Sequence, residues 1–340
     1  MKKTTVKYSQ ASTDFYFETS FSQLKEIVDK QRTVLLTDTN IFEAHPAKFK
    51  GWKTIVVPAG EAHKHMDTVS SVIEKLIGLE ADRQWTLVGV GGGVITDLAG
   101  FVAAIYMRGI AFGFVPTSIL AMVDASIGGK NGVDVGVYKN MAGIIRQPQF
   151  LLYDVSLLKT LPEQEWINGF AEIIKHACIK DAAMFKQLQQ NDLAFYQRKK
   201  AELQKLIERN VKIKAKVVQT DEFEKADRKL LNYGHTLGHA IENELQLPHG
   251  FAISIGMVYA AHLSQNLSGL KASAVNQIIE VLEKYGLPTH ANIDMAQAFD
   301  ILKMDKKRQE NSMNYIVLEK IGSAKVQKID LKELQTLLNN

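Results

Sequence analysis

The sequence predicts a first half of the α/β class, with a parallel sheet, and a mainly helical second half. Short β-rich apolar runs at residues 33–37, 52–57 and 85–90 each end at polar residues, proline or glycine. A helical pattern separates the second run from the third, and such alternation is typical of a parallel sheet covered on both faces. After about Leu157 helical periodicity dominates, which indicates a change of architecture.

The elements of the first half follow from these patterns. Residues 66–79 predict a helix because apolar side chains recur on one face, namely Val69, Val72, Ile73, Leu76 and Ile77. Residues 94–107 predict a second helix, and residues 113–116 a fourth strand. Polar residues follow the strands, as Asp38 and Asn40 follow the first.

The second half shows helical periodicity at residues 163–179, 182–193, 199–220 and 253–267, and again around the histidines of residues 228–250. Residues 315–318 predict one late strand. Two domains are therefore expected, residues 1–157 and residues 158–340, with a boundary that depends on this change of texture alone.

Composition excludes several classes of protein. The chain has 340 residues, 46% hydrophobic and 23% charged, with a net charge of +4 and both signs interleaved, so no basic stripe indicates a nucleic-acid partner. A single cysteine, Cys178, excludes an internal disulfide and favours a reducing, cytoplasmic location. No stretch of about 18 apolar residues predicts a membrane span.

A run of glycines opens the helix that follows the third strand. Gly92 and Gly93 let the backbone approach a ligand, and the helix N-terminus beyond them favours a pyrophosphate. Gly89 and Gly91 match the first two glycines of the dinucleotide motif, but Val94 occupies the position of the third. An ordinary tight turn remains an equal alternative.

Charged and polar residues cluster elsewhere in the first half. Glu61 with Lys64, and Thr117 with Ser118, follow strands where α/β sheets place ligands, although plain turns would also explain them. The loop 124–140 carries cationic Lys130 and Lys139 among glycines, which suit phosphate or carboxylate oxygens unless they are solvated surface lysines. Asp97 and Arg108 are read as charges inside an otherwise apolar helix, where each needs a partner or a ligand.

Three histidines gather in the second half. His235 and His239 are one helical turn apart, and His249 follows Pro248 on what we expect to be a returning loop. Imidazoles so spaced can converge on zinc, although hydrogen-bonded structural histidines are the alternative. Glu172 and Lys175 are neighbours on one helical face and form either a surface ion pair or a metal carboxylate beside a lysine.

Many stretches in order resemble the 3-dehydroquinate synthase family over nearly the whole chain. They read PAGEAHK, GGGVITDLAGFVAAIYMRG, VPTSILAMVDASIGGKNGVD, KNMAGIIRQP, GFAEIIKH, DEFEKADRKLLNYGHTLGHAIE, HGFAISIGM and MDKK. The resemblance implies a Rossmann-like NAD-binding domain, an α-helical domain that binds Zn²⁺ or Co²⁺, and a homodimer.

The resemblance also implies residue roles. The metal ligands would be Glu172, His235 and His249. NAD would contact Asp38, Asn40, Glu61, Lys64, Gly92, Gly93, Asp97, Thr117 and Ser118. Catalytic roles would fall to His239, Lys130, Asn140, Arg108, Lys175, Asp124 and Glu224, with Arg108 reaching across the dimer. Further substrate contacts would come from Lys139, Lys214, Arg228, Asn232 and one of Lys306 or Lys307.

The implied reaction converts 3-deoxy-D-arabino-heptulosonate 7-phosphate, an anionic sugar phosphate, to 3-dehydroquinate and phosphate in the shikimate pathway. Three alternatives remain at this point. A cyclase of the inosose or valiolone type would act on a sugar phosphate without a carboxylate, a metal-dependent polyol dehydrogenase would accumulate NADH, and a non-catalytic binding protein would have lost ligand or lysine positions. Lys214, Arg228 and Asn232 favour the carboxylate-bearing substrate.

Overall fold

A computed structural model describes residues 1–136, 138–294, 298–299, 308–309 and 312–339. The chain forms two compact units, one of Met1–Glu165 with Ala201–Glu222 and the other of Trp166–Lys200 with Phe223–Asn340. A single boundary between residues 157 and 158 was predicted, whereas residues 201–222 of the second half group with the first unit. Helical periodicity shows that a helix has a buried face, but it does not show what covers that face.

The first unit is built on a seven-stranded sheet in the order β1-β2-β9-β6-β5-β3-β4. Its strands are β1 (Lys2–Lys7), β2 (Ser12–Phe17), β3 (Thr33–Asp38), β4 (Lys53–Val57), β5 (Thr86–Gly91), β6 (Ala111–Pro116) and β9 (Phe150–Leu152). Only β1 and β2 pair antiparallel, and the other neighbours are parallel. The four predicted strands and the parallel sheet are therefore confirmed.

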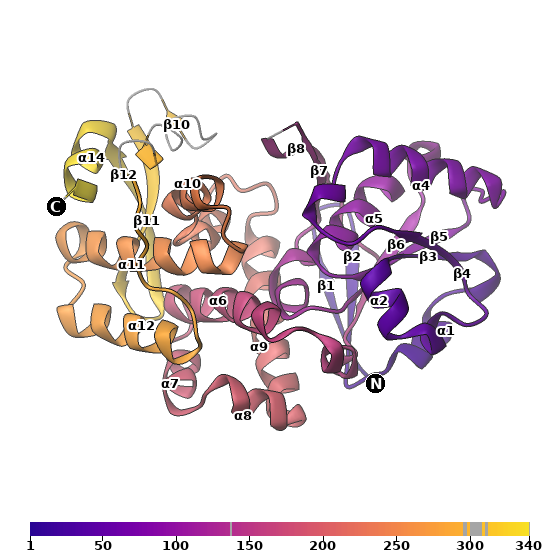
Figure 1. Cartoon of the computed structure of the whole chain (residues 1–340), viewed down its shortest axis with the longest axis horizontal. Coiled ribbons are helices and arrows are strands. Elements are labelled where there is room, and N and C mark those ends of the chain that lie inside the picture. The colour runs from indigo at the N-terminus through magenta and orange to yellow at the C-terminus, as the bar shows by residue number, and fades with distance from the viewer. Residues whose placement is uncertain (137, 295–297, 300–307, 310–311, 340) are drawn as a thin grey trace. The chain divides into compact units, whose positions relative to one another are not determined.

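Helices cover both faces of this sheet (Figure 1). They are α1 (Leu24–Ile27), α2 (Thr39–Ala44), α3 (Pro46–Phe49), α4 (Met66–Gly78) and α5 (Gly93–Ile105). Most of α9 (Lys200–Thr220) also belongs to this unit. Helix α4 buries Val69, Val72 and Leu76 as predicted, whereas Ile77 is 61% exposed. Ile77 is thus a wrong assignment, because it lies at the margin of the apolar face and at the last turn of the helix.

The strand order brings the polar strand ends of the first unit to one edge. Strand β4 lies on one side of β3, and the chain then crosses to β5 and β6 on the other side. The direction in which the chain adds strands to the sheet therefore reverses between β3 and β5. Ligands of open α/β sheets bind at the carboxyl ends of the strands beside such a reversal. Asp38 and Gly92 lie there, at the ends of β3 and β5.

The second unit is mainly helical, with α6 (Glu163–Lys180), α7 (Ala182–Gln190), α8 (Leu193–Arg198), α10 (His235–Leu245), α11 (His249–Ser268), α12 (Ala272–Lys284) and α14 (Leu331–Asn339). The predicted helix 182–193 is α7, which ends earlier, at Gln190. Leu193 is already the first residue of α8, whose start is capped by the side chain of Asp192, which accepts from the backbone N–H of Phe195. Among the residues described here, no helix is both long and apolar enough to cross a membrane.

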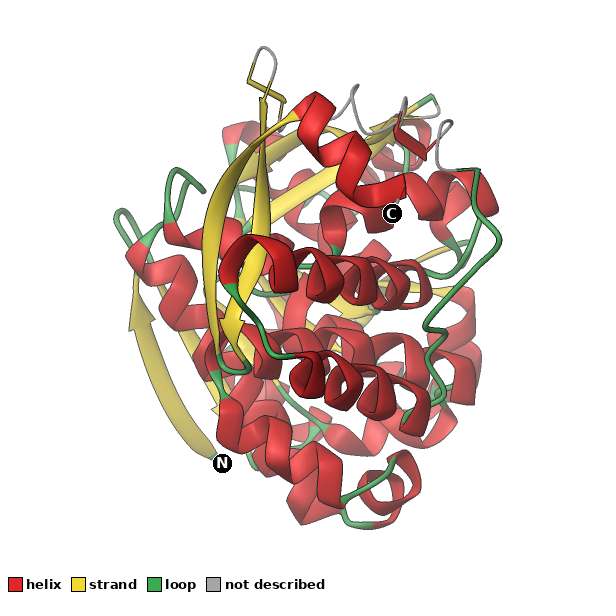
Figure 2. Cartoon of the chain, turned by 90° about the vertical axis from the view of Figure 1, so that its left-hand side faces the viewer, coloured by secondary structure: helices red, strands yellow, loops and turns green. Residues whose placement is uncertain are grey.

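A small antiparallel sheet completes the second unit, formed by β10 (Arg308–Gln309), β11 (Ser312–Lys320) and β12 (Ser323–Asp330). Figure 2 shows the long β11–β12 hairpin beside the stacked helices. The predicted strand 315–318 forms the buried centre of β11, where Tyr315 and Val317 are almost fully covered. Strand β12 was missed because only one of its eight residues, Ile329, is buried and its sequence is largely polar.

Candidate metal centre and nucleotide site

Three helices of the second unit bring Glu172, His235 and His249 together. Glu172 lies in the buried middle of α6, His235 is the first residue of α10, and His249 is the first residue of α11. Gly234 precedes His235 with a φ of 78°, and a Cβ there would lie 2.9 Å from the backbone oxygen of Ile253. Glycine at this position therefore lets α10 begin against α11.

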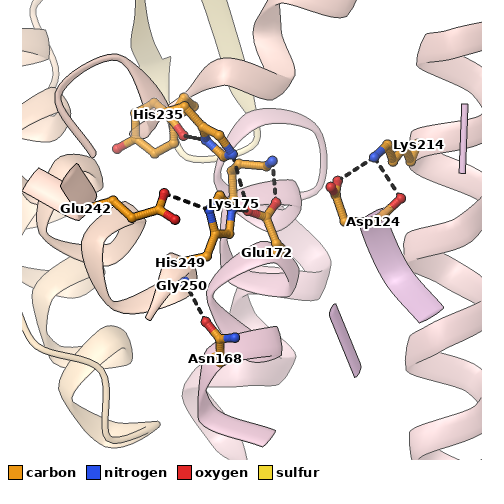
Figure 3. Close-up of polar contacts among 10 residues, drawn as sticks. Asp124, Asn168, Glu172, Lys175, Lys214, His235, Glu242, His249 and Gly250 are labelled. Atoms are coloured by element: carbon orange, nitrogen blue, oxygen red, sulfur yellow. Dashed lines mark hydrogen bonds and ion pairs between the residues drawn. The ribbon is translucent and has the colours of Figure 1, made fainter. Parts of the chain in front are cut away.

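The ligand atoms of this group face one another (Figure 3). The Nε2 atoms of His235 and His249 lie 3.4 Å and 3.3 Å from the same atom, Oε1 of Glu172. One ligand atom from each of the three residues lies within 4.8 Å of the others. Two imidazole nitrogens and one carboxylate oxygen form a donor set that suits zinc and leaves a coordination position for a substrate oxygen.

The other ring nitrogens of both histidines have acceptors. Nδ1 of His235 lies 3.2 Å from the backbone oxygen of Tyr233, and Nδ1 of His249 lies 3.3 Å from Oε2 of Glu242. A ligating histidine almost always donates its second ring N–H to a carboxylate or a carbonyl. The residues present therefore fit a metal centre in two respects, namely the ligand atoms and the hydrogen-bond acceptors of the two histidine ligands.

The charges of the cluster also favour a cation. Glu172 is fully buried, and its Oε2 contacts the ammonium group of Lys175, which is itself buried. Burial by itself lowers the pKa of His249, but the hydrogen bonds to Glu172 and Glu242 outweigh it and raise that pKa to about 9. The negative field that holds this proton is the field that would hold a divalent cation.

His239 belongs to the same cluster, although in a different place. Its ring centre lies 5.3 Å from that of His235 and 6.2 Å from that of His249. His239, Glu242 and His249 form a second group whose ligand atoms lie within 4.8 Å of one another. The exclusion of His239 from the ligand set thus stays a prediction.

His249 was expected to lie on a returning loop, and this prediction is wrong. Pro248 is the N-cap residue of α11, and His249 is the first residue of that helix.

A close backbone contact holds α11 against α6. The backbone N–H of Gly250 donates to Oδ1 of Asn168 at 2.5 Å, and a Cβ on Gly250 would lie 2.1 Å from the backbone oxygen of Asn168. Asn168 is one helical turn before Glu172, and Gly250 is adjacent to His249. This contact therefore sets the separation of two predicted metal ligands.

In the first unit, the glycines after β5 divide between packing and ligand approach. A Cβ on Gly89 or Gly91 would lie 2.8 Å or less from side chains of α5, so these two glycines let the helix pack on its own strand. Gly92 caps α5, and among the described residues a Cβ there would meet only the hydroxyl of Ser118, at 3.5 Å. The space beside Gly92 and Ser118 suits the pyrophosphate of a dinucleotide.

Lys64 joins several predicted site residues of the first unit. Its Nζ lies 2.7 Å from Oδ2 of Asp97 and 3.7 Å from Glu61, and it donates to Oδ1 of Asn140 at 2.7 Å. Burial by itself would lower the pKa of Lys64, but Asp97 and Glu61 outweigh it and raise that pKa. Asp97 thus has the partner that its place on an apolar helix required.

Burial has the larger effect on Asp97, whose pKa it raises from 3.8 to about 6 against the influence of Lys64. The folded protein therefore holds a proton on Asp97 between pH 3.8 and about pH 6 that the unfolded chain gives up. Its contribution to stability is present below this window and is lost as the pH rises through it.

We expect Asp97→Asn, which cannot lose this proton, to gain unfolding free energy relative to the parent protein as the pH rises from about 4 to about 6, by at most about 1.4 kcal/mol per pH unit. Urea unfolding at several pH values measures the difference. A difference that shrinks over this range would contradict the assigned pKa.

Two further pairs hold predicted substrate residues. In the first unit, Nζ of Lys214 on α9 donates to the backbone oxygen of Asp124 and lies 2.8 Å from its Oδ1. In the second unit, the amide of Asn232 donates to Glu224 at 2.6 Å. Arg228 is only 2% exposed and lies in the short 3-10 helix Asp227–Asn232. The two cations of this set, Lys214 and Arg228, are therefore both buried.

The interpretation of Arg108 as a charge within the helix is wrong. Helix α5 ends at Ile105, and Met107, Arg108 and Gly109 follow with positive φ angles of 51°, 66° and 119°. Arg108 is exposed, so water solvates it and no partner is needed.

The remaining predicted cations are also not buried where the structure describes them. Lys130 and Lys139 are exposed, on β7 (Lys130–Val135) and β8 (Tyr138–Ile145). Lys306 and Lys307 lie outside the described residues.

Glu242 and Asn168 were not predicted from the sequence as site residues. Glu242 follows His235 by seven residues and His239 by three, so all three side chains share one face of α10. That spacing was a usable signal. Asn168 offered no signal of its own, because its role depends on a backbone group 82 residues away.

Family comparisons agree with this geometry. The N-terminal domain family of 3-dehydroquinate synthase matches residues 54–168, and the C-terminal domain family of the same enzyme matches residues 169–308. The chain belongs to the 3-dehydroquinate synthase family. A family member from Acetivibrio thermocellus is 37% identical over 335 residues, which cover 94% of this chain and 93% of the relative. One from Campylobacter concisus is 42% identical and covers 83% of this chain and 81% of its own.

Solved structures with the same fold include two synthases that contain NAD⁺ and a divalent metal. A 2-deoxy-scyllo-inosose synthase, complexed with carbaglucose-6-phosphate, NAD⁺ and Co²⁺, superposes with a TM-score of 0.86 at 24% identity, covering 99% of both chains. A 2-epi-5-epi-valiolone synthase from Streptomyces hygroscopicus, with NAD⁺ and Zn²⁺ bound, gives 0.87 at 23% identity, covering 100% and 98%. Together with the family match, these structures confirm the predicted fold, a parallel-sheet domain followed by a helical domain.

Proposed function

We propose that this chain is a 3-dehydroquinate synthase that converts 3-deoxy-D-arabino-heptulosonate 7-phosphate to 3-dehydroquinate and phosphate. The observation that carries the proposal is the convergence of Glu172, His235 and His249 in a chain matched over most of its length by this family. NAD and a divalent cation, Zn²⁺ or Co²⁺, are its cofactors. Two proteins of the same fold, whose structures contain NAD⁺ with Co²⁺ or with Zn²⁺, support this choice.

NAD would supply a reversible hydride acceptor, and the cation would supply a Lewis acid for the substrate oxygens. Glu172, His235 and His249 hold the cation, and Lys175 neutralises the second oxygen of Glu172. The strand ends of the first unit hold NAD, with Asp38 and Asn40 after β3, Glu61 and Lys64 after β4, Gly92, Gly93 and Asp97 after β5, and Thr117 and Ser118 after β6.

Cationic and amide side chains bind the anionic ends of the substrate. Lys130, Lys139, Asn140 and His239 contact the phosphate, and they stabilise the charge that builds up as it leaves. Lys214 and Arg228 bind the carboxylate, and Asn232 and Glu224 orient the hydroxyl groups. Buried cations suit this task, since water competes with them less than with exposed lysines.

A coupled assay separates this function from its alternatives. Purified protein with substrate, catalytic NAD and Zn²⁺ should release phosphate continuously while the NADH absorbance stays flat. Accumulation of NADH with turnover would instead identify a polyol dehydrogenase. Preference for a sugar phosphate that lacks a carboxylate would identify a cyclase of the inosose or valiolone type.

The proposed enzyme is a homodimer in which Arg108 of one copy reaches the phosphate of the other. Arg108 is exposed beside Met107, which is 46% exposed, and β8 exposes the apolar side chains of Tyr138, Met141, Ile144 and Ile145. Exposed apolar groups of this number favour coverage by a second copy.

We expect a mixture of inactive Arg108→Ala and inactive Lys175→Ala proteins to regain activity as hybrid dimers form, because each hybrid contains one site with both residues intact. Phosphate release after subunit exchange measures the recovery. Absence of recovery, with exchange demonstrated by differently tagged chains, would contradict the shared site.

A further inference from the structure

Glu242 lies next to the predicted metal ligands but belongs to no ligand set that the family resemblance implies. It is 8% exposed, on the face of α10 that carries His235 and His239. Its Oε2 lies 3.3 Å from Nδ1 of His249, on the side of the imidazole opposite to Glu172 (Figure 3). The ring of His249 is thus flanked by two carboxylates, one at each nitrogen.

We infer that Glu242 is a positioning residue that selects the tautomer and ring orientation of His249 for metal binding. A neutral imidazole carries one proton, and whichever nitrogen donates it cannot bind a metal. Because the carboxylate of Glu242 accepts from Nδ1–H, the lone pair is left on Nε2, which faces Glu172. The carboxylate also increases the basicity of the ring and so strengthens it as a ligand.

The two histidine ligands differ in this respect. Nδ1 of His235 faces a neutral backbone carbonyl, that of Tyr233, whereas Nδ1 of His249 faces a carboxylate. Removing the side chain at position 242 therefore affects one ligand and leaves the acceptor of the other in place. The inference rests on the proposed metal centre, and its test must separate the two.

Metal affinity provides that test without any measurement of activity. The proteins are the parent, Glu242→Gln, Glu242→Leu, His235→Ala, and Glu280→Gln as a control that makes the same carboxylate-to-amide change at an exposed position of α12. The Kd for Zn²⁺ is measured by competition with a chelator of known affinity. The visible absorption of the Co²⁺-loaded proteins reports the ligand geometry.

We expect Glu242→Leu to weaken Zn²⁺ binding about 10- to 100-fold, as loss of the partner of a ligating histidine does elsewhere. Glu242→Gln should lose less, because its amide oxygen still accepts from Nδ1–H, and its Co²⁺ spectrum should stay nearer to that of the parent. Glu280→Gln should stay within about twofold of the parent, as exposed substitutions do. Urea unfolding of each metal-free variant shows whether the fold is intact, separately from the change in metal affinity.

Other results would overturn the inference in distinguishable ways. If His235→Ala weakens Zn²⁺ binding and Glu242→Leu does not, Glu242 has no positioning role although the metal centre stands. If neither variant changes the affinity, the proposed metal centre itself fails. If the parent binds two cations per chain and Glu242→Leu binds one, Glu242 is a ligand, with His239 and His249, of a second cation.

Discussion

Glu172→Ala, His235→Ala and His249→Ala should each lower the affinity for Zn²⁺ by more than about 100-fold, beyond the effect of losing an outer partner. Each removes one of the three ligand atoms of the proposed site, which lie within 4.8 Å of one another. His239→Ala should keep the metal and lose the catalytic rate, since the proposal gives it a phosphate contact. Metal content after gel filtration and phosphate release measure the two effects.

Glu172→Ala needs its own control, because it also removes the carboxylate that contacts buried Lys175. Breaking a buried ion pair costs about 3–5 kcal/mol, so this variant could unfold for a reason unrelated to the metal. Glu172→Gln keeps the shape of the side chain, and urea unfolding of each metal-free variant separates loss of fold from loss of ligand. Equal metal loss in His239→Ala and His235→Ala would show that the ligand set is wrong.

Arg228→Ala should lower kcat/KM by roughly 30-fold to several thousand-fold. Arg228 is 2% exposed, so a substrate carboxylate that reaches it meets a cation little screened by water. Removing one partner of a buried, hydrogen-bonded charge pair costs about 2–5 kcal/mol, at about 1.4 kcal/mol per tenfold change in rate. Arg228→Lys should recover little, because an ammonium group cannot reproduce the two-point contact of a guanidinium.

The specificity of that effect is tested with a substrate analogue that lacks the carboxylate. The parent protein should bind the analogue weakly, and Arg228→Ala should bind it about equally well. Metal content and the affinity for NAD should stay unchanged in Arg228→Ala, because neither is assigned to this arginine. An equal loss for analogue and substrate would mean that Arg228 does not recognise the carboxylate, and a cyclase for neutral sugar phosphates would become the better proposal.

Much of the fold could be predicted from local patterns in the sequence. Strands β3, β5 and β6 are buried on both faces, so each appears as a continuous apolar run, and the switch to helical periodicity is equally local. Strands β1, β2, β7, β8, β9, β10 and β12 were missed. Most of them are short or largely exposed, so their apolar content does not distinguish them from loops.

The candidate site divides in the same way. Residue type and helical spacing were enough to single out His235, His239, Glu172 and Lys175. They were also enough to suggest a role for the glycines after β5, although not which of those glycines serve packing and which serve ligand approach. That distinction depends on the distance from each Cα to α5, which only the packed helix defines.

What the sequence by itself determined is therefore the class of each half, the family, and the residues able to bind a cation or an anion. Only the tertiary structure decided that Arg108 lies beyond its helix and is solvated, that Lys64 pairs with Asp97, and that Glu242 faces the outer nitrogen of His249. The physical reason is the separation along the chain of the groups that interact. Periodicity and turn chemistry act within a few residues, whereas the orientation of a ring or the partner of a buried charge is set by atoms far away in the chain.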